Sequence, residues 1–238
     1  MRLHLHDDLM ISKKTGPTDL VTQMDQQVQK DLVEKITHRY PEDRIFAEED
    51  GLRSPISEGS VWVIDPIDGT NNFVTQKEDF AVMVAYFEDG IGQFGLIYDV
   101  MRDHLFYGGG EFPVYRNEVE LTPFVDQPLE NFLIASNVGM LEKNDWGMAD
   151  LGMDSLGIRV YGSAGISFSK ILSGGILAYF SYIWPWDYAA AAIMGEQLGY
   201  TVLNLNGDKP NYQTVEPIMM VPKVKLTEIQ TYLKKGRS

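Results

Sequence analysis

The sequence predicts a layered α/β fold, and three features of the chain lead to this prediction. Apolar residues recur at helical spacing over residues 19–39. Short apolar strands then follow one another over residues 80–107. The second half alternates apolar strands with helical segments, and this alternation favours sheets whose faces are covered by helices.

In the first half, the amphipathic helix is expected to end before Pro41, because proline interrupts a helix. A strand over residues 44–47 and a buried strand over residues 61–64 follow. Residues 80–107 predict an antiparallel meander. Its first turn is Asp89-Gly90, a dipeptide typical of tight hairpins.

The second half predicts strands over residues 132–135, 158–161, 176–180, 201–204 and 218–221, and helices over residues 164–173, 187–198 and 226–235. No linker is long or polar enough to separate freely moving domains. We place the boundary between Gly110 and Asn131. This divides the chain into residues 1–125, with the acidic motifs of the first half, and residues 126–238.

The composition excludes several classes of function. The formal net charge of −14 repels nucleic acid and anionic membranes, so neither is expected as a partner. Cysteine is absent, which excludes disulfides and thiolate metal sites. Residues 171–186 carry no charge but contain polar residues and glycines, and a spanning helix needs about 20 apolar residues. With no apolar signal-peptide core near Met1, we expect a cytoplasmic protein.

The most informative segment follows the buried strand at residues 61–64. This strand leads into two carboxylates, Asp65 and Asp68, and then into Gly69-Thr70, a pair suited to a turn that opens a helix. Carboxylates suit a hard cation, and the free N–H groups of a helix start suit a phosphate. The segment therefore predicts metal-assisted hydrolysis of a phosphate ester.

Two further carboxylates, Glu48 and Asp187, also follow a strand or begin a helix. Taken alone, Glu48 is better explained as a solvated surface residue than as a metal ligand. Taken alone, Asp187 is explained as well by a helix N-cap as by a metal ligand. Asp65 and Asp68 differ, because a buried strand running into two carboxylates is costly unless something pairs with them. An all-oxygen set favours Mg²⁺ or Mn²⁺ over Zn²⁺.

The segment Trp62–Phe73 closely resembles the signature of the inositol monophosphatase family, which comprises Mg²⁺-dependent, lithium-sensitive phosphatases. Three other segments resemble family motifs in the family's order: Asp19-Leu20-Val21-Thr22 with Asp25, Ala47-Glu48-Glu49-Asp50, and Trp186-Asp187-Tyr188-Ala189-Ala190-Ala191. The resemblance implies a five-layer αβαβα sandwich and a homodimer. Relatives usually carry a longer helical segment before the position of Asp19, and that segment often joins the dimer contact.

The resemblance also implies the metal ligands. Glu48, Asp65 and the backbone carbonyl of Ile67 would hold a first ion, and Asp65, Asp68 and Asp187 a second. A third, weaker ion would rely on Glu48 and water. Two or three Mg²⁺ ions are therefore expected in each active site.

The catalytic roles implied by the resemblance centre on the attacking water. Thr70 and Glu48 would orient this water, with Asp25 supporting Thr70. The backbone N–H groups of Gly69 and Thr70 would hold the phosphate. The implied mechanism is inline attack by water without a phosphoenzyme.

Substrate contacts are implied at two places. Arg159–Ala164 resembles a family segment that borders the hydroxyl side of the substrate, which indicates contacts from Gly162, Ser163 and Ala164. Phe180 stands seven residues before Asp187, where inositol-specific members place a glutamate. An aromatic ring there would stack on a base or face a sugar, or else belong to the core. Without the glutamate, broad or nucleotide-directed specificity is favoured.

The sequence thus predicts a Mg²⁺-dependent phosphomonoesterase acting on inositol 1-phosphate, on other small esters such as the 2′-phosphate of NADP, or on both. The enzymatic alternatives within the superfamily are a fructose 1,6-bisphosphatase and a 3′-phosphoadenosine 5′-phosphate phosphatase. The alternative from another class is a catalytically silent, metal-dependent binding module. Retention of the metal ligands together with Thr70 argues against that alternative.

Overall fold

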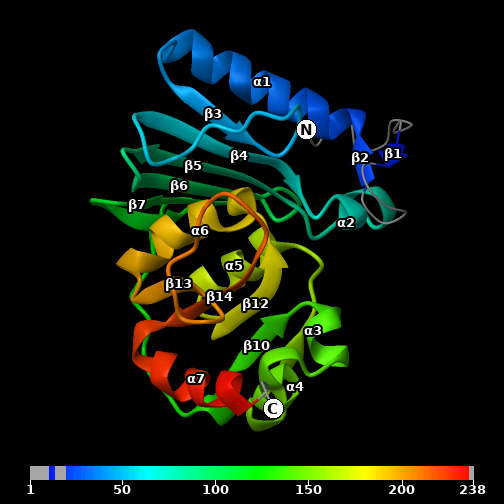
Figure 1. Cartoon of the computed structure of the whole chain (residues 1–238), viewed down its shortest axis with the longest axis vertical. Coiled ribbons are helices and arrows are strands. Elements are labelled where there is room, and N and C mark those ends of the chain that lie inside the picture. Colours follow the sequence, from blue (N-terminus) through cyan, green and yellow to red (C-terminus); the bar gives the residue numbers. More distant parts are fainter. Residues whose placement is uncertain (1–10, 14–19, 236–238) are drawn as a thin grey trace.

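The structure, a computed structural model, describes residues 11–13 and 20–235. In this part of the chain the elements stack as five layers, in the order helix, sheet, helix, sheet, helix (Figure 1). The predicted αβαβα sandwich is therefore confirmed. No helix within these residues is both long and apolar enough to cross a membrane.

The first sheet has seven strands in the order β3-β4-β5-β6-β7-β8-β9. The first two strands are parallel and all other neighbours are antiparallel. The predicted hairpin turn joins β5 to β6, and Asp89 and Gly90 have the positive φ values, 47° and 81°, that tight hairpin turns need. The strands are Arg44–Ala47 (β3), Ser60–Asp68 (β4), Ala81–Glu88 (β5), Ile91–Asp99 (β6), His104–Gly109 (β7), Phe112–Arg116 (β8) and Val119–Glu120 (β9).

The second sheet has five strands in the order β11-β10-β12-β14-β13. Its β10 strand runs parallel to both β11 and β12, whereas β14 runs antiparallel to both its neighbours. The strands are Leu133–Ser136 (β10), Gly157–Arg159 (β11), Ala178–Ile183 (β12), Tyr200–Asn204 (β13) and Glu216–Pro222 (β14). A separate antiparallel pair is formed by Ile11–Lys13 (β1) and Leu20–Thr22 (β2).

The helices form the other three layers. One long helix covers the outer face of the first sheet, two helices lie between the sheets, and three cover the outer face of the second sheet (Figure 1). In that order they are Gln23–Arg39 (α1); Ala164–Leu172 (α5) and Pro185–Gln197 (α6); and Val138–Glu142 (α3), Met148–Asp154 (α4) and Leu226–Lys235 (α7). The short helix Thr70–Thr75 (α2) follows β4, and 3₁₀ turns among the described residues are Leu129–Asn131, Asp145–Gly147 and Lys223–Lys225.

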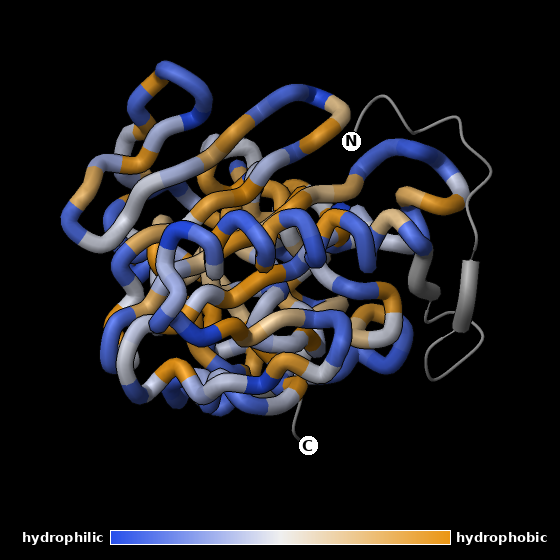
Figure 2. The backbone as a smooth tube through the Cα atoms, turned by 90° about the horizontal axis from the view of Figure 1, so that it is seen from above, coloured by the Kyte–Doolittle hydropathy of each residue, from blue (hydrophilic) through white to orange (hydrophobic). Residues whose placement is uncertain are grey.

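The central helix α6 packs closely on the first sheet, and small residues make this possible. A Cβ atom added at Gly95 of β6 would lie 2.4 Å from the carbonyl oxygen of Ala190. The small alanine side chains of residues 189–191 thus allow the first turns of α6 to lie directly against the sheet. Figure 2 shows hydrophobic segments gathered at the centre of the molecule and hydrophilic ones along its outer loops. The buried helices α5 and α6 begin between the two sheets, close to the end of β4 that carries Asp65 and Asp68.

Most predicted elements are present within a few residues of their expected bounds, including β3, the meander and all five strands of the second sheet. The helix expected over residues 19–39 begins only at Gln23, because Leu20–Thr22 forms a strand instead. The elements β8, β9, α3 and α4 were not predicted. The division at residue 125 stays a prediction, since α5 and α6 pack between both sheets.

Candidate active site

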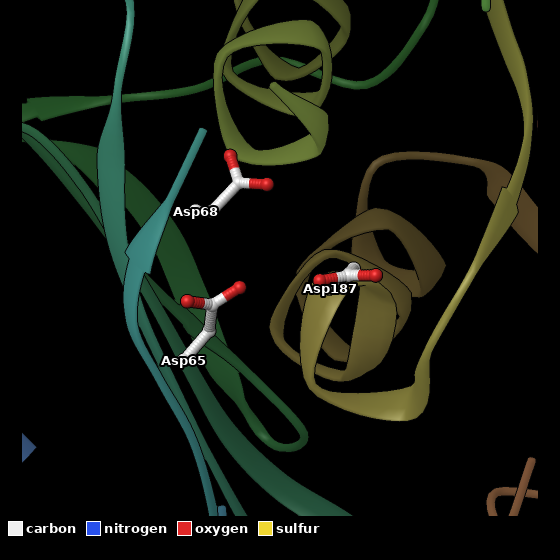
Figure 3. A group of neighbouring side chains, drawn as sticks. All are labelled: Asp65, Asp68 and Asp187. Atoms are coloured by element: carbon white, nitrogen blue, oxygen red, sulfur yellow. The ribbon is translucent and has the colours of Figure 1, made fainter. Parts of the chain in front are cut away.

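Strand β4 carries Asp65 and Asp68 into one cluster. Side chains alternate between the two faces of a strand, so residues three apart would normally face opposite ways. The pairing of β4 with β5 shifts register between these two residues, and Pro66 lies in the irregular stretch. Both carboxylates therefore point toward the same space (Figure 3), where they are 1% and 7% exposed.

Asp187 enters this space from the first turn of α6. Its Oδ2 accepts a hydrogen bond of 2.7 Å from the backbone N–H of Trp184, so it caps the helix. Ligand atoms of Asp65, Asp68 and Asp187 lie within 4.8 Å of one another (Figure 3). The two interpretations of Asp187, helix cap and member of a metal site, are thus compatible: one oxygen caps the helix while the residue faces the cluster.

Asp68 is held by the start of α5. Its Oδ1 accepts from the N–H of Ala164 at 3.0 Å, and its Oδ2 accepts from the N–H of Gly165 at 2.7 Å and from the hydroxyl of Ser163. The Ser163 hydroxyl also caps α5 by accepting from the N–H of Ile166 at 3.1 Å. The structure therefore brings Ser163 and Ala164 to the cluster, while their contact with a substrate stays a prediction.

The three clustered carboxylates resist ionising together. Burial raises the pKa of Asp65 and of Asp187 well above 3.8, and the charges of Glu48 and Asp68 raise both further. Burial also raises the pKa of Asp68, although its hydrogen bonds from Ser163, Gly165 and Ala164 act in the opposite direction. A positive charge in the cluster would reverse this penalty.

The donor set fits a divalent cation that prefers oxygen. Asp65 Oδ1 is buried and has no hydrogen-bond partner, and an unsatisfied buried oxygen is costly. It belongs to the same compact group as Asp68 and Asp187. Carboxylate oxygens in this arrangement are the ligands that Mg²⁺ and Mn²⁺ take in proteins.

Thr70 lies beside the cluster at the start of α2. Its Oγ1 is 3.1 Å from Asp25 Oδ1 and 3.1 Å from the carbonyl oxygen of Ile67, so the hydroxyl donates toward these acceptors. Asp25 is fully buried on α1. The preceding residue, Gly69, has φ of 87°, which favours glycine. The structure thus brings Asp25 into contact with Thr70, while the supporting role that the resemblance implies for Asp25 stays a prediction.

Glu48 follows β3 at the edge of the site. Its N–H donates to the carbonyl of Ile64 at 3.1 Å, which fastens the loop after β3 to β4. Its carboxylate acts electrostatically on Asp65 and Asp187 but does not belong to their compact group. Asp19, the first residue of the N-terminal motif, lies outside the described residues.

The predicted contact at Phe180 is wrong. Its ring is fully buried and packs with Ile134, Leu177 and Met219 in the core on the outer side of the second sheet. Strand alternation turns its neighbour Tyr179 to the opposite face, where the Tyr179 hydroxyl is close enough to be affected by Asp68 and Asp187. Phe180 is therefore a core residue.

Tyr179 and Ser181, two polar residues on the inner face of β12, are not part of any motif in the sequence. Ser181, on the same face of β12 as Tyr179, accepts a hydrogen bond of 3.1 Å from the Nδ2 of Asn137. Ser181 is buried within β12, whereas the buried Ser136 ends β10 and pairs in register with Phe180. The alternation of β12 was a signal that could have found Tyr179 and Ser181, because the strand was predicted and position 180 was assigned to the wrong face.

Comparison with known proteins identifies the family. The model of the inositol monophosphatase family matches residues 1–235. The inositol-1-monophosphatase of Bacillus subtilis is 37% identical over 210 residues, which cover 86% of this chain and 79% of the relative.

Solved structures that share the fold include the following two. An inositol monophosphatase/NADP phosphatase complexed with Mg²⁺ and phosphate has a TM-score of 0.89 and 25% identity, and the match covers 97% of this chain and 88% of the other. A 2′-AMP-bound structure of SaIMPase-II has a TM-score of 0.83 and 30% identity, with 89% and 83% covered. The chain belongs to the inositol monophosphatase family and is a phosphoric monoester hydrolase.

Proposed function

We propose that this enzyme is a Mg²⁺-dependent phosphomonoesterase that acts on inositol 1-phosphate, on the 2′-phosphate of NADP, or on both. The observation that carries the proposal is that ligand atoms of Asp65, Asp68 and Asp187 lie within 4.8 Å of one another. Two of these residues end β4, directly before the start of α2. The name of the Bacillus relative supports the inositol ester. The NADP phosphatase and the 2′-AMP complex support a 2′-phosphate.

The acidic residues would hold the cations as two overlapping sets. Glu48, Asp65 and the carbonyl of Ile67 would form one set, and Asp65, Asp68 and Asp187 the other, with Asp65 shared. When bound, two divalent cations activate water for attack and stabilise the leaving oxygen. A third cation near Glu48 is proposed from the family resemblance alone, as is sensitivity to lithium.

Thr70 and Glu48 would orient the attacking water. Because the Thr70 hydroxyl donates toward Asp25 and Ile67, its oxygen lone pairs can accept a hydrogen bond from the water and so direct a water lone pair at phosphorus. The N–H groups of Gly69 and Thr70 would bind the phosphate oxygens. The new P–O bond to water then forms as the bond to the leaving alcohol breaks.

Two further predictions remain part of this proposal. A cytoplasmic location rests on the sequence alone. The homodimer rests on the family resemblance. Sedimentation of the purified chain would test the dimer independently of catalysis.

The test is phosphate release from a panel of esters, with and without Mg²⁺. The panel contains inositol 1-phosphate, NADP, fructose 1,6-bisphosphate and 3′-phosphoadenosine 5′-phosphate. We expect Mg²⁺-dependent release from inositol 1-phosphate, NADP or both. Preferential release from either of the last two would replace the proposed substrate by one of the superfamily alternatives. No release from any ester by folded, Mg²⁺-binding protein would favour the silent binding module.

The matched variant is Asp187→Asn. Asparagine keeps an oxygen that can accept from the N–H of Trp184, so α6 should remain capped while one negative charge is lost. We expect turnover to fall roughly 10²- to 10³-fold, the range for removing one electrostatic contact of a transition state. Near-normal turnover by this variant would show that Asp187 does not hold a catalytic cation.

A further inference from the structure

Arg53 connects the loop that carries Glu48 to the helix that carries Asp187. Its guanidinium lies 4.6 Å from the ring centre of Trp186, the residue directly before Asp187. The same guanidinium donates hydrogen bonds to carbonyl oxygens on both sides of Glu48's loop: Ala47, Leu52 at 3.0 Å and Glu48 itself at 3.3 Å. One side chain thus contacts both acidic motifs.

The loop after β3 is also fastened to β4 and α1: the N–H of Glu48 donates to the carbonyl of Ile64 at 3.1 Å, and the N–H of Glu49 donates to Gln29 Oε1 at 2.9 Å. The ends of the loop are joined by the N–H of Ala47, which donates to Leu52 at 3.0 Å, and by the bridge between Phe46 and Arg53. Within this hairpin turn, Asp50 and Gly51 both have positive φ. The Arg53 side chain folds back over the turn and occupies its carbonyl groups, which reduces the number of positions open to Glu48.

Trp186 gives the guanidinium a fixed support. Its indole is 4% exposed, packs edge-on against Phe46 with 5.6 Å between ring centres, and stacks on Trp184 with 4.9 Å between centres and 9° between planes. A guanidinium on such a ring gains both dispersion and cation–π attraction. The position of Arg53 is therefore set by the same residues that begin α6.

The charge of Arg53 also suits the site. Partial burial lowers the pKa of its guanidinium, while the nearby carboxylates of Glu48 and Glu49 raise it. A guanidinium stays protonated under such shifts. Arg53 thus contributes a fixed positive charge beside the carboxylates of Glu48 and Glu49.

We propose that Arg53 is a positioning residue for the metal site, holding the Glu48 loop against Trp186 so that Glu48 and Asp187 face the same cations. The inference rests on the proposed function, because it assumes that both carboxylates serve one metal site. A preorganised loop pays less entropy when a cation binds, so removing Arg53 should weaken the affinity for Mg²⁺.

The experiment measures Mg²⁺ binding to the purified chain by titration calorimetry, without substrate. Arg53→Met keeps an unbranched side chain that still covers Trp186 but donates no hydrogen bond and carries no charge. We expect its Kd for Mg²⁺ to rise roughly tenfold, as expected for the loss of about one charge-assisted hydrogen bond. Arg53→Lys keeps the charge without the planar fork and should recover only part of the affinity.

The control is Arg39→Met. Arg39 also lies over an aromatic ring, 5.4 Å from the centre of Tyr40, but Tyr40 stacks on Trp62 near the beginning of β4. Its loss should leave the Kd for Mg²⁺ unchanged. A Kd for Arg53→Met equal to that of the unmodified chain would overturn the inference, as would an equal change in Arg39→Met.

Thermal unfolding of the metal-free protein distinguishes a purely structural role of Arg53 from its positioning role at the metal site. Arg53 is exposed on its outer side, so Arg53→Met is expected to fold. In a role limited to stabilising the hairpin, loss of Arg53 would lower the metal-free melting temperature without changing the Kd for Mg²⁺.

The test of Arg53 can also fail or succeed independently of the proposed function. If the unmodified chain binds Mg²⁺ but releases no phosphate from any ester, the proposed function fails, while the comparison of Kd values still decides the role of Arg53.

Discussion

At the scale of single residues, Asp68 illustrates how one carboxylate serves both the fold and the site. Its two oxygens accept from Ser163, Ala164 and Gly165, so it fastens the start of α5 to the end of β4. Asp65 lies in the same group, yet its Oδ1 has no hydrogen-bond partner. Asp68 therefore stabilises the metal-free protein, whereas Asp65 mainly adds repulsion.

This difference leads to a prediction for two matched variants. In Asp68→Asn, the amide –NH₂ would face an N–H or hydroxyl donor of α5, so we expect the free energy of unfolding to fall by about 1–3 kcal/mol. Asp65→Asn should leave metal-free stability unchanged or raise it, because burial and like charges penalise its ionised form. Urea unfolding in EDTA measures both. Equal stability of the two variants would contradict the assignment, and both should lose Mg²⁺-dependent turnover.

Residue-level prediction from sequence succeeded where local chemistry decided the outcome. The order of strand, carboxylates and Gly-Thr turn after residue 61 is sufficient to predict the start of α2 and that Asp65 and Asp68 gather just before it, while their role as metal ligands stays a prediction. It failed at Phe180, because a residue count back from Asp187 does not show which face of β12 a side chain occupies. Arg53 could not be predicted at all, since its role depends on Trp186, which is distant in sequence and adjacent only in the folded protein.

At the scale of elements, the approach of α5 to the turn between β4 and α2 assembles the site. A Cβ atom at Gly69 would lie 2.9 Å from Ser163 Cβ and 3.1 Å from the carbonyl oxygen of Asp79. Gly69 also has φ of 87°. Gly174 has a similar φ of 74°, but a Cβ atom there would meet nothing within 4 Å. The two glycines therefore separate backbone strain from close packing.

We predict that Gly174→Ala costs about 1–2 kcal/mol in the free energy of unfolding, from backbone strain alone. Gly69→Ala should cost about 1–3 kcal/mol more, because overpacking displaces either α5 or the turn. It should also reduce turnover, since Asp68 and Thr70 flank the displaced segment. Urea unfolding and phosphate release check both variants. Equal stability losses with normal turnover in Gly69→Ala would show that α5 and the turn can separate without consequence.

The bounds of helices and strands could be predicted where the spacing of apolar residues sets them. They were harder to predict where the pairing of one strand with another sets them. The helix predicted from residue 19 begins at Gln23, because Leu20–Thr22 pairs with Ile11–Lys13 instead. That pairing is a tertiary choice that local periodicity cannot reveal. The strands of the second sheet were predicted, but their order was not, since it depends on contacts between segments that are far apart in the sequence.

At the scale of the whole molecule, the acidic cluster makes stability depend on pH and metal together. Folding raises the pKa of Asp65 and Asp187 above the ordinary 3.8, with burial as the largest cause and neighbouring carboxylates next. The folded state therefore binds more protons than the unfolded state once the pH exceeds that value. The contribution of these groups to stability is present below the ordinary pKa and is lost as the pH rises through the folded pKa.

We accordingly predict that Mg²⁺ stabilises the protein more at about pH 8 than at about pH 5. At the lower pH, protons already neutralise part of the cluster and must be displaced before a cation binds. At the higher pH, fewer protons occupy the cluster, so its carboxylates repel one another more strongly, and the overall charge of −14 adds to this repulsion. Melting temperatures in EDTA and in saturating Mg²⁺ across this range measure the effect.

Asp187→Asn is the control for this prediction, because it removes one titrating member of the cluster and keeps an acceptor for Trp184. In EDTA, its melting temperature should exceed that of the unmodified chain near pH 8, and the difference should shrink toward pH 5 as protonation relieves the repulsion in the unmodified cluster. Its Mg²⁺-induced rise in melting temperature should be smaller at both pH values. A Mg²⁺-induced rise in the unmodified chain that is independent of pH would mean that Asp65 and Asp187 are already ionised near pH 5. The mutual repulsion inferred from their burial would then not govern the stability of the metal-free protein.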